Sequence, residues 1–115
     1  MKDEYNSLQG TIKLWCFTKW ENCDIICADF IKIDSADVIV NVSDKKIGFI
    51  LSSNKTKDFL KQQIINCQKL YDKVILVTNN INFSAAGIKT FNDNVGLLNI
   101  SNTYGLGNII REIKI

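Results

Sequence analysis

The chain has 115 residues, of which 46% are hydrophobic and 23% charged. This is the size and composition of one soluble globular domain, residues 1–115. No apolar run reaches the roughly 18 residues that a membrane-spanning helix needs, so we expect no contact with a membrane. The first residues are acidic and polar, which argues against a secretory signal and predicts a cytoplasmic protein.

The net charge of +2 conceals an uneven distribution along the chain. Residues 1–44 carry 4 Lys and 8 acidic residues, whereas residues 45–73 carry 7 Lys and 2 Asp. A basic middle segment is typical of a solvated helix face, and it also suits contact with a phosphate backbone or an acidic protein. Arg111 is the one arginine among 14 basic residues. Because bidentate base reading favours Arg, the composition does not indicate sequence-specific DNA recognition.

Helical spacing of apolar residues predicts a first helix from about Lys2 to Trp20, although Gly10 weakens its centre. β-Branched and apolar residues from Asp24 to Ile33 predict a first strand, and Ala36 to Val42 a second. The apolar stripe of the helix consists of Tyr5, Leu8, Ile12, Trp15 and Cys16. In the second strand, alternation separates Val38, Val40 and Val42 from Asp37, Ile39 and Asn41.

A short turn over Ser43–Lys46 and a third strand over Ile47–Ser52 complete a predicted hairpin. Ser52, Ser53 and Asn54 are candidate N-caps for a second helix from about Lys55 to Tyr71. The apolar stripe of this helix consists of Leu60, Ile64, Cys67 and Tyr71.

The remaining chain predicts a buried strand over Val74–Val77 and a polar loop over Asn79–Asn94. A short strand over Val95–Ile100 follows, and then a turn over Asn102–Asn108. Ile109–Ile115 alternates weakly and fits either a last strand or a short helix. A helix between the third and fourth strands implies a right-handed parallel crossover.

The chain contains no His, which removes Ser-His and Cys-His nucleophilic catalysis. The spacings of the four cysteines lack the Cys-x-x-Cys pair that structural zinc usually uses. We therefore expect Cys16, Cys23, Cys27 and Cys67 to be free thiols, with Cys16 and Cys67 on the apolar stripes of the two helices.

Four short stretches between Ala36 and Ile100 carry a resemblance to a known family. They are Phe49-Ile50-Leu51-Ser52, Gln63-Ile64-Ile65-Asn66-Cys67, Tyr71-Asp72-Lys73-Val74 and Val95-Gly96-Leu97. Their order and spacing resemble small stand-alone PD-(D/E)XK nucleases, the restriction-endonuclease-like fold. The resemblance implies an α/β domain with an αβββαβ core, a mixed central sheet flanked by two helices, and extra C-terminal strands.

In that family, an Asp on one strand and a Glu-x-Lys triplet on the next hold a divalent metal and activate water. Here Asp37 matches the Asp and Gln63 a glutamine that the family often keeps near the site, but Phe49 and Leu51 replace the Glu and Lys. Apolar side chains cannot coordinate Mg²⁺, which binds hard oxygen ligands. The resemblance thus implies a remnant, inactive site without a metal or cofactor. Outside such a site, Asp37 would be a hydrogen-bonded carboxylate at a strand start and Gln63 a helix-border amide.

The resemblance implies a catalytically inactive nuclease-fold protein that acts by binding a nucleic-acid backbone or a protein. Lys55, Lys57, Lys61 and Lys69 are the candidate contacts. By analogy alone, such a protein suits a phage or mobile-element inhibitor, or an accessory subunit of a nuclease or defence system.

Two alternatives stay open. One is an active, divergent Mg²⁺-dependent nuclease in which Asp37 works with migrated partners such as Glu4, Asp29, Asp34 or the lysines. The other is a homodimer that forms through an edge strand, for which Ile109–Ile115 is the candidate.

Overall fold

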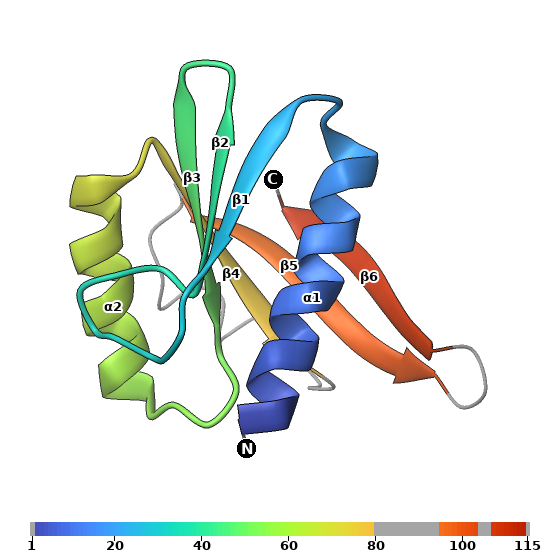
Figure 1. Cartoon of the computed structure of the whole chain (residues 1–115). Coiled ribbons are helices and arrows are strands. Elements are labelled where there is room, and N and C mark those ends of the chain that lie inside the picture. The colour runs from blue at the N-terminus through green and yellow to red at the C-terminus, as the bar shows by residue number, and fades with distance from the viewer. Residues whose placement is uncertain (1, 80–94, 104–106, 115) are drawn as a thin grey trace.

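A computed structural model describes residues 2–79, 95–103 and 107–114. They form an α/β fold in which one six-stranded mixed sheet lies between two helices (Figure 1). The elements are α1 (Lys2–Lys19), β1 (Cys23–Cys27), β2 (Val38–Val42), β3 (Lys45–Leu51), α2 (Lys57–Leu70), β4 (Lys73–Asn79), β5 (Val95–Thr103) and β6 (Gly107–Lys114). The strands lie side by side in chain order. The β3–β4 and β4–β5 pairs are parallel, and the others are antiparallel.

Each helix covers one face of the sheet. Helix α1 buries Leu8, Ile12 and Cys16 against one face, which confirms the apolar stripe predicted there. Helix α2 buries Leu60, Ile64 and Cys67 against the other face, again as the spacing predicts. None of the described helices is long and apolar enough to cross a membrane.

The predicted first strand, Asp24–Ile33, is wrong in its second half because β1 ends at Cys27. The amide of Ala28 still pairs with the carbonyl of Asp37 at 3.0 Å, and the chain then leaves the sheet. Side chains of α2 bind the following carbonyls instead, since Gln63 Nε2 donates to Ser35 O at 2.8 Å and Asn66 Nδ2 to Ile33 O at 3.1 Å. Apolar residues in this segment therefore resemble a strand in sequence but lie in a loop tied to α2.

The β2–β3 hairpin is present, but its turn is shorter than the predicted Ser43–Lys46. The two turn residues are Ser43 and Asp44, and β3 begins at Lys45. Ser43 adopts a φ of 53°, in the left-handed region that tight two-residue hairpins require. Val38 pairs with Phe49, which fixes the register of the two strands near the start of β2.

Helix α2 begins later than predicted, and its N-cap is Thr56 rather than Ser52, Ser53 or Asn54. The Thr56 hydroxyl accepts a hydrogen bond from the amide of Phe59 at 3.1 Å. Lys55 consequently precedes the helix instead of lying on its face, which changes its role in the site described below.

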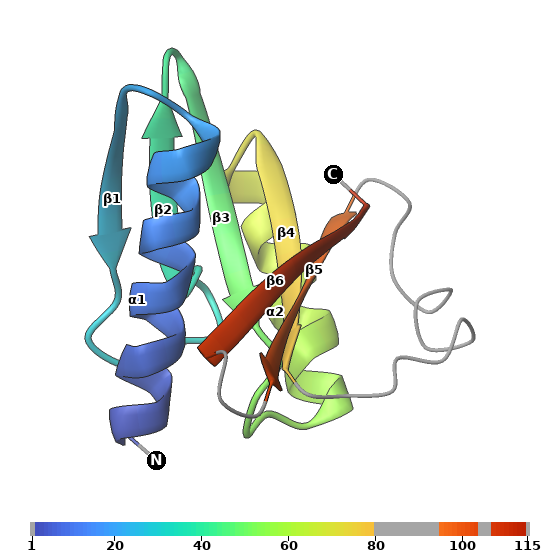
Figure 2. The same ribbon diagram turned by 90° about the vertical axis from the view of Figure 1, so that its right-hand side faces the viewer.

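In the C-terminal part of the sheet, β4 and β5 are longer than the strands predicted there. Strand β4 contains the predicted buried strand, and β5 runs three residues past its predicted end at Ile100. The last segment is a strand, β6, so the alternative of a short helix is wrong. Figure 2 shows β6 beside β5 at one edge of the sheet, with β1 at the opposite edge. The predicted loop after Asn79 and the centre of the predicted turn at 104–106 lie outside the described residues.

Candidate functional site

Asp37 lies directly before β2 and is held there by backbone contacts on both sides. Its amide donates to the carbonyl of Phe49 in β3 at 2.9 Å, and its carbonyl accepts from the amide of Ala28 at 3.0 Å. The carbonyl also accepts from Gln9 Nε2 of α1 at 2.9 Å. These contacts fix the main chain from which the carboxylate projects.

The carboxylate of Asp37 is buried, with 1% of the residue exposed, and both of its oxygens are occupied. Oδ1 accepts from the hydroxyl of Tyr5 at 2.8 Å. Oδ2 accepts from the amide of Leu51 at 2.8 Å and from Lys55 Nζ at 2.5 Å. Charge-assisted bonds of this length are among the strongest that side chains form.

The Lys55 ammonium joins Asp37 to helix α2. Its side chain is 2% exposed, and Nζ also donates to Gln63 Oε1 at 2.8 Å. Gln63 is fully buried, and its Nε2 donates to the carbonyls of Lys32 at 3.2 Å and Ser35 at 2.8 Å. We refer to Tyr5, Asp37, Lys55 and Gln63 as the polar cluster; it connects α1, the start of β2, the segment before α2, and the loop after β1.

Burial shifts the protonation equilibria of the polar cluster. Desolvation is the main cause that lowers the pKa of Lys55, while the charge of Asp37 and their hydrogen bond oppose this shift. Burial, followed by the charge of Asp37, raises the pKa of Tyr5 well above its ordinary value. Tyr5 therefore stays a hydrogen-bond donor to the carboxylate. A buried ion pair is tolerated when its remaining hydrogen-bonding positions are filled in this way.

Phe49 and Leu51, which the resemblance predicts to replace a metal-binding Glu and Lys, are core residues. Both are packed in the apolar cluster beneath α1, as expected for large apolar side chains in β3. The Phe49 ring makes an edge contact with Trp15 at a centroid distance of 6.1 Å. Leu51 reaches the polar cluster through its backbone amide alone. Neither side chain offers an atom that could bind a metal.

Of the migrated partners proposed for Asp37, the structure brings Lys55 to the carboxylate, but it brings neither Asp29 nor Asp34 into the polar cluster. Asp29 and Asp34 are both exposed, and the side chain of Glu4 is outside the described part of the chain. Within the described residues, no group of three His, Cys, Asp or Glu side chains could hold a metal ion. All four cysteines are free thiols.

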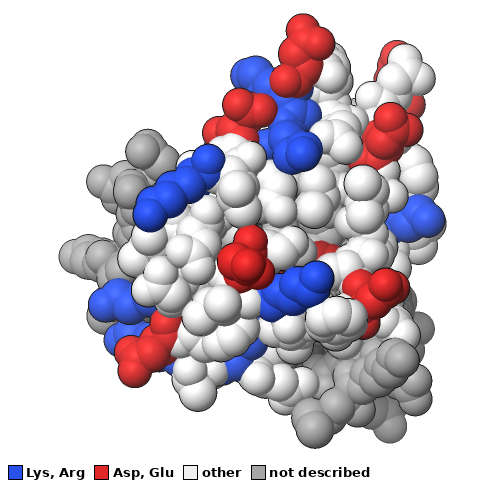
Figure 3. Space-filling model, turned by 60° about the vertical axis from the view of Figure 1, so that its left-hand side comes forward, with Lys and Arg blue, Asp and Glu red and all other residues white. Residues whose placement is uncertain are grey.

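Three of the four lysines predicted to contact a partner lie on the surface. Lys57, Lys61 and Lys69 are exposed on α2, as expected, but Lys55 is buried against Asp37 and is withdrawn as a surface contact. Figure 3 shows basic side chains interspersed with acidic ones on the face that it presents, rather than gathered in one patch.

Sequence reasoning singled out Asp37 and Gln63 but missed other members of the site. Gln9 is 3% exposed and binds the carbonyls of Ala28 and Asp37. Its spacing from Tyr5, four residues earlier, places both on one side of α1 and was the available signal. The burial of Lys55 carried no such signal, since it depends on where α2 begins.

Comparisons of the chain with protein-family models, curated proteins and solved structures find no match. The chemistry of the site must therefore be read from its own geometry. A carboxylate whose oxygens are filled by a hydroxyl, an amide and an ammonium is poorly suited to bind a metal ion or activate water.

Proposed function

We propose that this protein is a non-catalytic binding protein built on the fold of the PD-(D/E)XK nucleases, in which a lysine ammonium stands in place of the metal ion. The order of the described elements supports the proposal, because an α-β-β-β-α-β core leads into additional strands. The position of Asp37 at the start of β2 and its link through Lys55 to Gln63 on α2 support it further.

The observation that carries the proposal is the environment of Lys55 Nζ. The ammonium lies between Asp37 Oδ2 and Gln63 Oε1, which are carboxylate and amide oxygens of the kind that Mg²⁺ binds. The positive charge of this buried side chain compensates the charge of Asp37. The cluster thus has the character of a structural connection rather than of a hydrolytic centre.

If the polar cluster is a structural connection, a partner has to bind elsewhere on the surface. The described surface favours a protein partner over a nucleic acid. Lys57, Lys61 and Lys69 are exposed, but acidic residues are interspersed among the basic side chains. Several large apolar side chains are exposed as well, among them Leu14 at 69% and Phe30 at 62%. Apolar side chains contribute to protein interfaces more readily than to contacts with a phosphate backbone.

A cleavage and binding assay tests the proposal. Purified protein and the matched Asp37→Asn variant are incubated with single- and double-stranded DNA and RNA in Mg²⁺ or Mn²⁺. We expect no cleavage from either. Metal-dependent cleavage that the variant lacks would establish the alternative, a divergent nuclease that uses Asp37.

The same samples separate the two classes of partner. Nucleic-acid binding through Lys57, Lys61 and Lys69 must weaken steeply as salt increases, because counterions are released. We expect no such salt-dependent binding. A steep salt dependence that Lys57→Glu or Lys61→Glu reduces would identify a nucleic-acid backbone as the partner instead.

A further inference from the structure

Strand β1 presents an open edge of the sheet (Figure 1). The Ala28 amide donates to Asp37 O, so the alternation of an antiparallel pair directs the main-chain groups of Asp24 and Ile26 toward β2. Those of Cys23, Ile25 and Cys27 then face away from the sheet. Such a row of amides and carbonyls is a template for another strand.

The two edges of the sheet differ in how well they are protected against pairing. Strand β6 carries three charged residues, Arg111, Glu112 and Lys114, which is a common device against edge-to-edge association. Strand β1 has the sequence Cys-Asp-Ile-Ile-Cys, and its only charge is Asp24. Ile26 on this strand is 56% exposed. Association is therefore expected at β1 rather than at β6.

A group of exposed apolar side chains continues from this edge. Phe30, Ile31 and Ile33 are 62%, 38% and 40% exposed, and they follow Ile26 closely in the chain. They belong to residues 28–35, which we call the docking loop. Its carbonyls are bound by Gln63 and Asn66 of α2, so the loop is preorganised on the α2 side of the sheet. Preorganisation lowers the entropic cost of binding.

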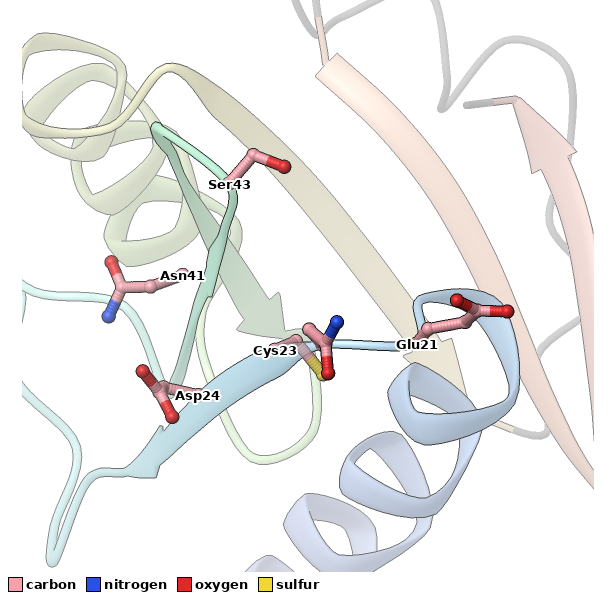
Figure 4. A pocket seen from close by; sticks show the side chains of 6 residues that line it. Glu21, Cys23, Asp24, Asn41 and Ser43 are labelled. Atoms are coloured by element: carbon pink, nitrogen blue, oxygen red, sulfur yellow. The ribbon is translucent and has the colours of Figure 1, made fainter.

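A hollow with a mostly polar lining lies at the other end of β1. Its volume is about 390 Å³, and its lining is Glu21, Asn22, Cys23, Asp24, Asn41 and Ser43. Asp24 and Asn41 are register partners and project on the side of α2 (Figure 4). Part of the hollow thus lies on the same side of the sheet as the docking loop, at the opposite end of β1, while Cys23 of its lining packs on the α1 side.

We propose that two copies of this chain pair antiparallel along β1, about a two-fold axis at Ile25, so that the docking loop of each copy contacts the hollow of the other. A two-fold axis perpendicular to the sheet leaves the α2 sides of both copies facing the same way. It places the start of one β1 beside the end of the other. The loop at the end of one β1 is thereby placed beside the hollow at the start of the other, as an isologous interface requires.

The charges of the docking loop and of the hollow are only partly complementary. Lys32 lies over the Phe30 ring, with Nζ 4.9 Å from the ring centroid, and supplies a cation for Asp24 of the second copy. The loop also carries Asp29 and Asp34, which would approach the same acidic hollow. The backbone ladder and the apolar side chains must therefore supply most of the affinity. The inference shares Gln63 with the polar cluster, because this side chain holds the docking loop, but it does not depend on whether the cluster is the remnant of a nuclease site.

Sedimentation equilibrium of the full chain tests the pairing. We expect a dimer for the unmodified protein and a monomer for Ile26→Glu, since each Glu would lie opposite Asp24 of the second copy and like charges across an antiparallel pair repel. Leu14→Glu is the matched control: Leu14 is 69% exposed on α1, on the side away from the buried stripe, so this variant should remain dimeric. Circular dichroism checks that both variants fold. A monomeric unmodified protein, or a dimer that persists in Ile26→Glu, would overturn the proposal.

Two charge changes with opposite expected signs test the contact of loop and hollow. Lys32→Glu should raise the dissociation constant about tenfold, through two symmetric contacts of roughly 0.7 kcal/mol each. Asp34→Asn should lower the dissociation constant, because it removes a negative charge that approaches Asp24. If Lys32→Glu tightens the dimer, or if neither variant changes the dissociation constant, the loop does not contact the hollow.

Discussion

At the scale of single residues, the polar cluster holds the Asp37 carboxylate in the protein interior. Asp37 and Lys55 together form a buried ion pair with no net charge. Asp37 is stabilised by Lys55 and by two neutral donors, and Gln63 fills a further position on the ammonium. Such a cluster is costly to leave half complete, because a single buried charge has no water to solvate it.

Removal of Lys55 should therefore destabilise the protein strongly. Lys55→Met leaves Asp37 buried and uncompensated, and we expect it to reduce the free energy of unfolding by about 3–5 kcal/mol. Urea denaturation measures the loss. The exposed Lys57→Met is the matched control and should change stability by less than about 0.5 kcal/mol.

The double variant Asp37→Asn/Lys55→Met completes this test. Because the two side chains act as one unit, the double variant should lose less stability than the sum of the two single variants. Additive losses would show that the two side chains contribute independently, which contradicts the pairing described above.

A second prediction at this scale concerns alkaline pH. Burial raises the pKa of Cys16 from 9.0 to about 12. Between these values the unfolded thiol loses its proton while the folded one keeps it, so stability is full below pH 9 and falls as pH rises.

Denaturation at several pH values checks the contribution of Cys16. Cys16→Ala should lose stability at every pH because it leaves a cavity, but its stability should fall less steeply above pH 9 than that of the unmodified protein. Parallel pH profiles for the two proteins would argue against a protonated, buried Cys16 thiol.

At the scale of elements, two glycines should respond to the same substitution in opposite directions. A Cβ on Gly48 of β3 would lie 2.7 Å from Tyr71 Cδ2 and 3.0 Å from the Ala36 Cβ, and the Tyr71 hydroxyl is itself held by the Ala36 amide. Gly48→Ala should cost about 1–3 kcal/mol through overpacking.

Gly10 of α1 is the matched case, since a Cβ there would meet no atom within 4 Å. Gly10→Ala should stabilise the protein by about 0.5–1 kcal/mol, because alanine is the better helix former. Thermal unfolding of both variants measures the two effects. A stabilised Gly48→Ala would contradict the close packing of Tyr71 against β3.

The attachment of the docking loop to α2 can be tested by proteolysis. Gln63→Leu keeps the buried volume but removes the bonds to the carbonyls of Lys32 and Ser35, so trypsin should cleave after Lys32 faster. The exposed Gln62→Leu leaves these bonds intact and should match the unmodified protein. Equal cleavage rates in both variants would mean that Gln63 does not hold the loop.

The sequence predicts elements where periodicity and burial agree, as in α1, α2 and β4. It fails at the end of β1, where Phe30, Ile31 and Ile33 are apolar but exposed, because side chains of α2 capture the backbone of the loop. It also misplaces Lys55, since a cap at Thr56 moves this residue off the helix and into the core. The first failure depends on contacts between segments about 30 residues apart, and the burial of Lys55 depends on Asp37, 18 residues earlier; local patterns contain neither, although the cap itself is a local bond between Thr56 and Phe59.

At the scale of the whole molecule, the sheet places two distinct features at separate positions. The polar cluster closes the space between α1, β2 and α2, and the open edge of β1 and the docking loop remain on the surface. The two features are connected, since Gln63 of the polar cluster also holds the docking loop in place.

Isothermal titration of Mn²⁺ into the pure protein, with Asp37→Asn titrated in parallel, tests this account most directly. The account predicts no saturable heat from either protein, because Lys55 already occupies the oxygens of Asp37 and Gln63. Saturable binding to the unmodified protein that Asp37→Asn abolishes would contradict it, since a metal would then displace the ammonium.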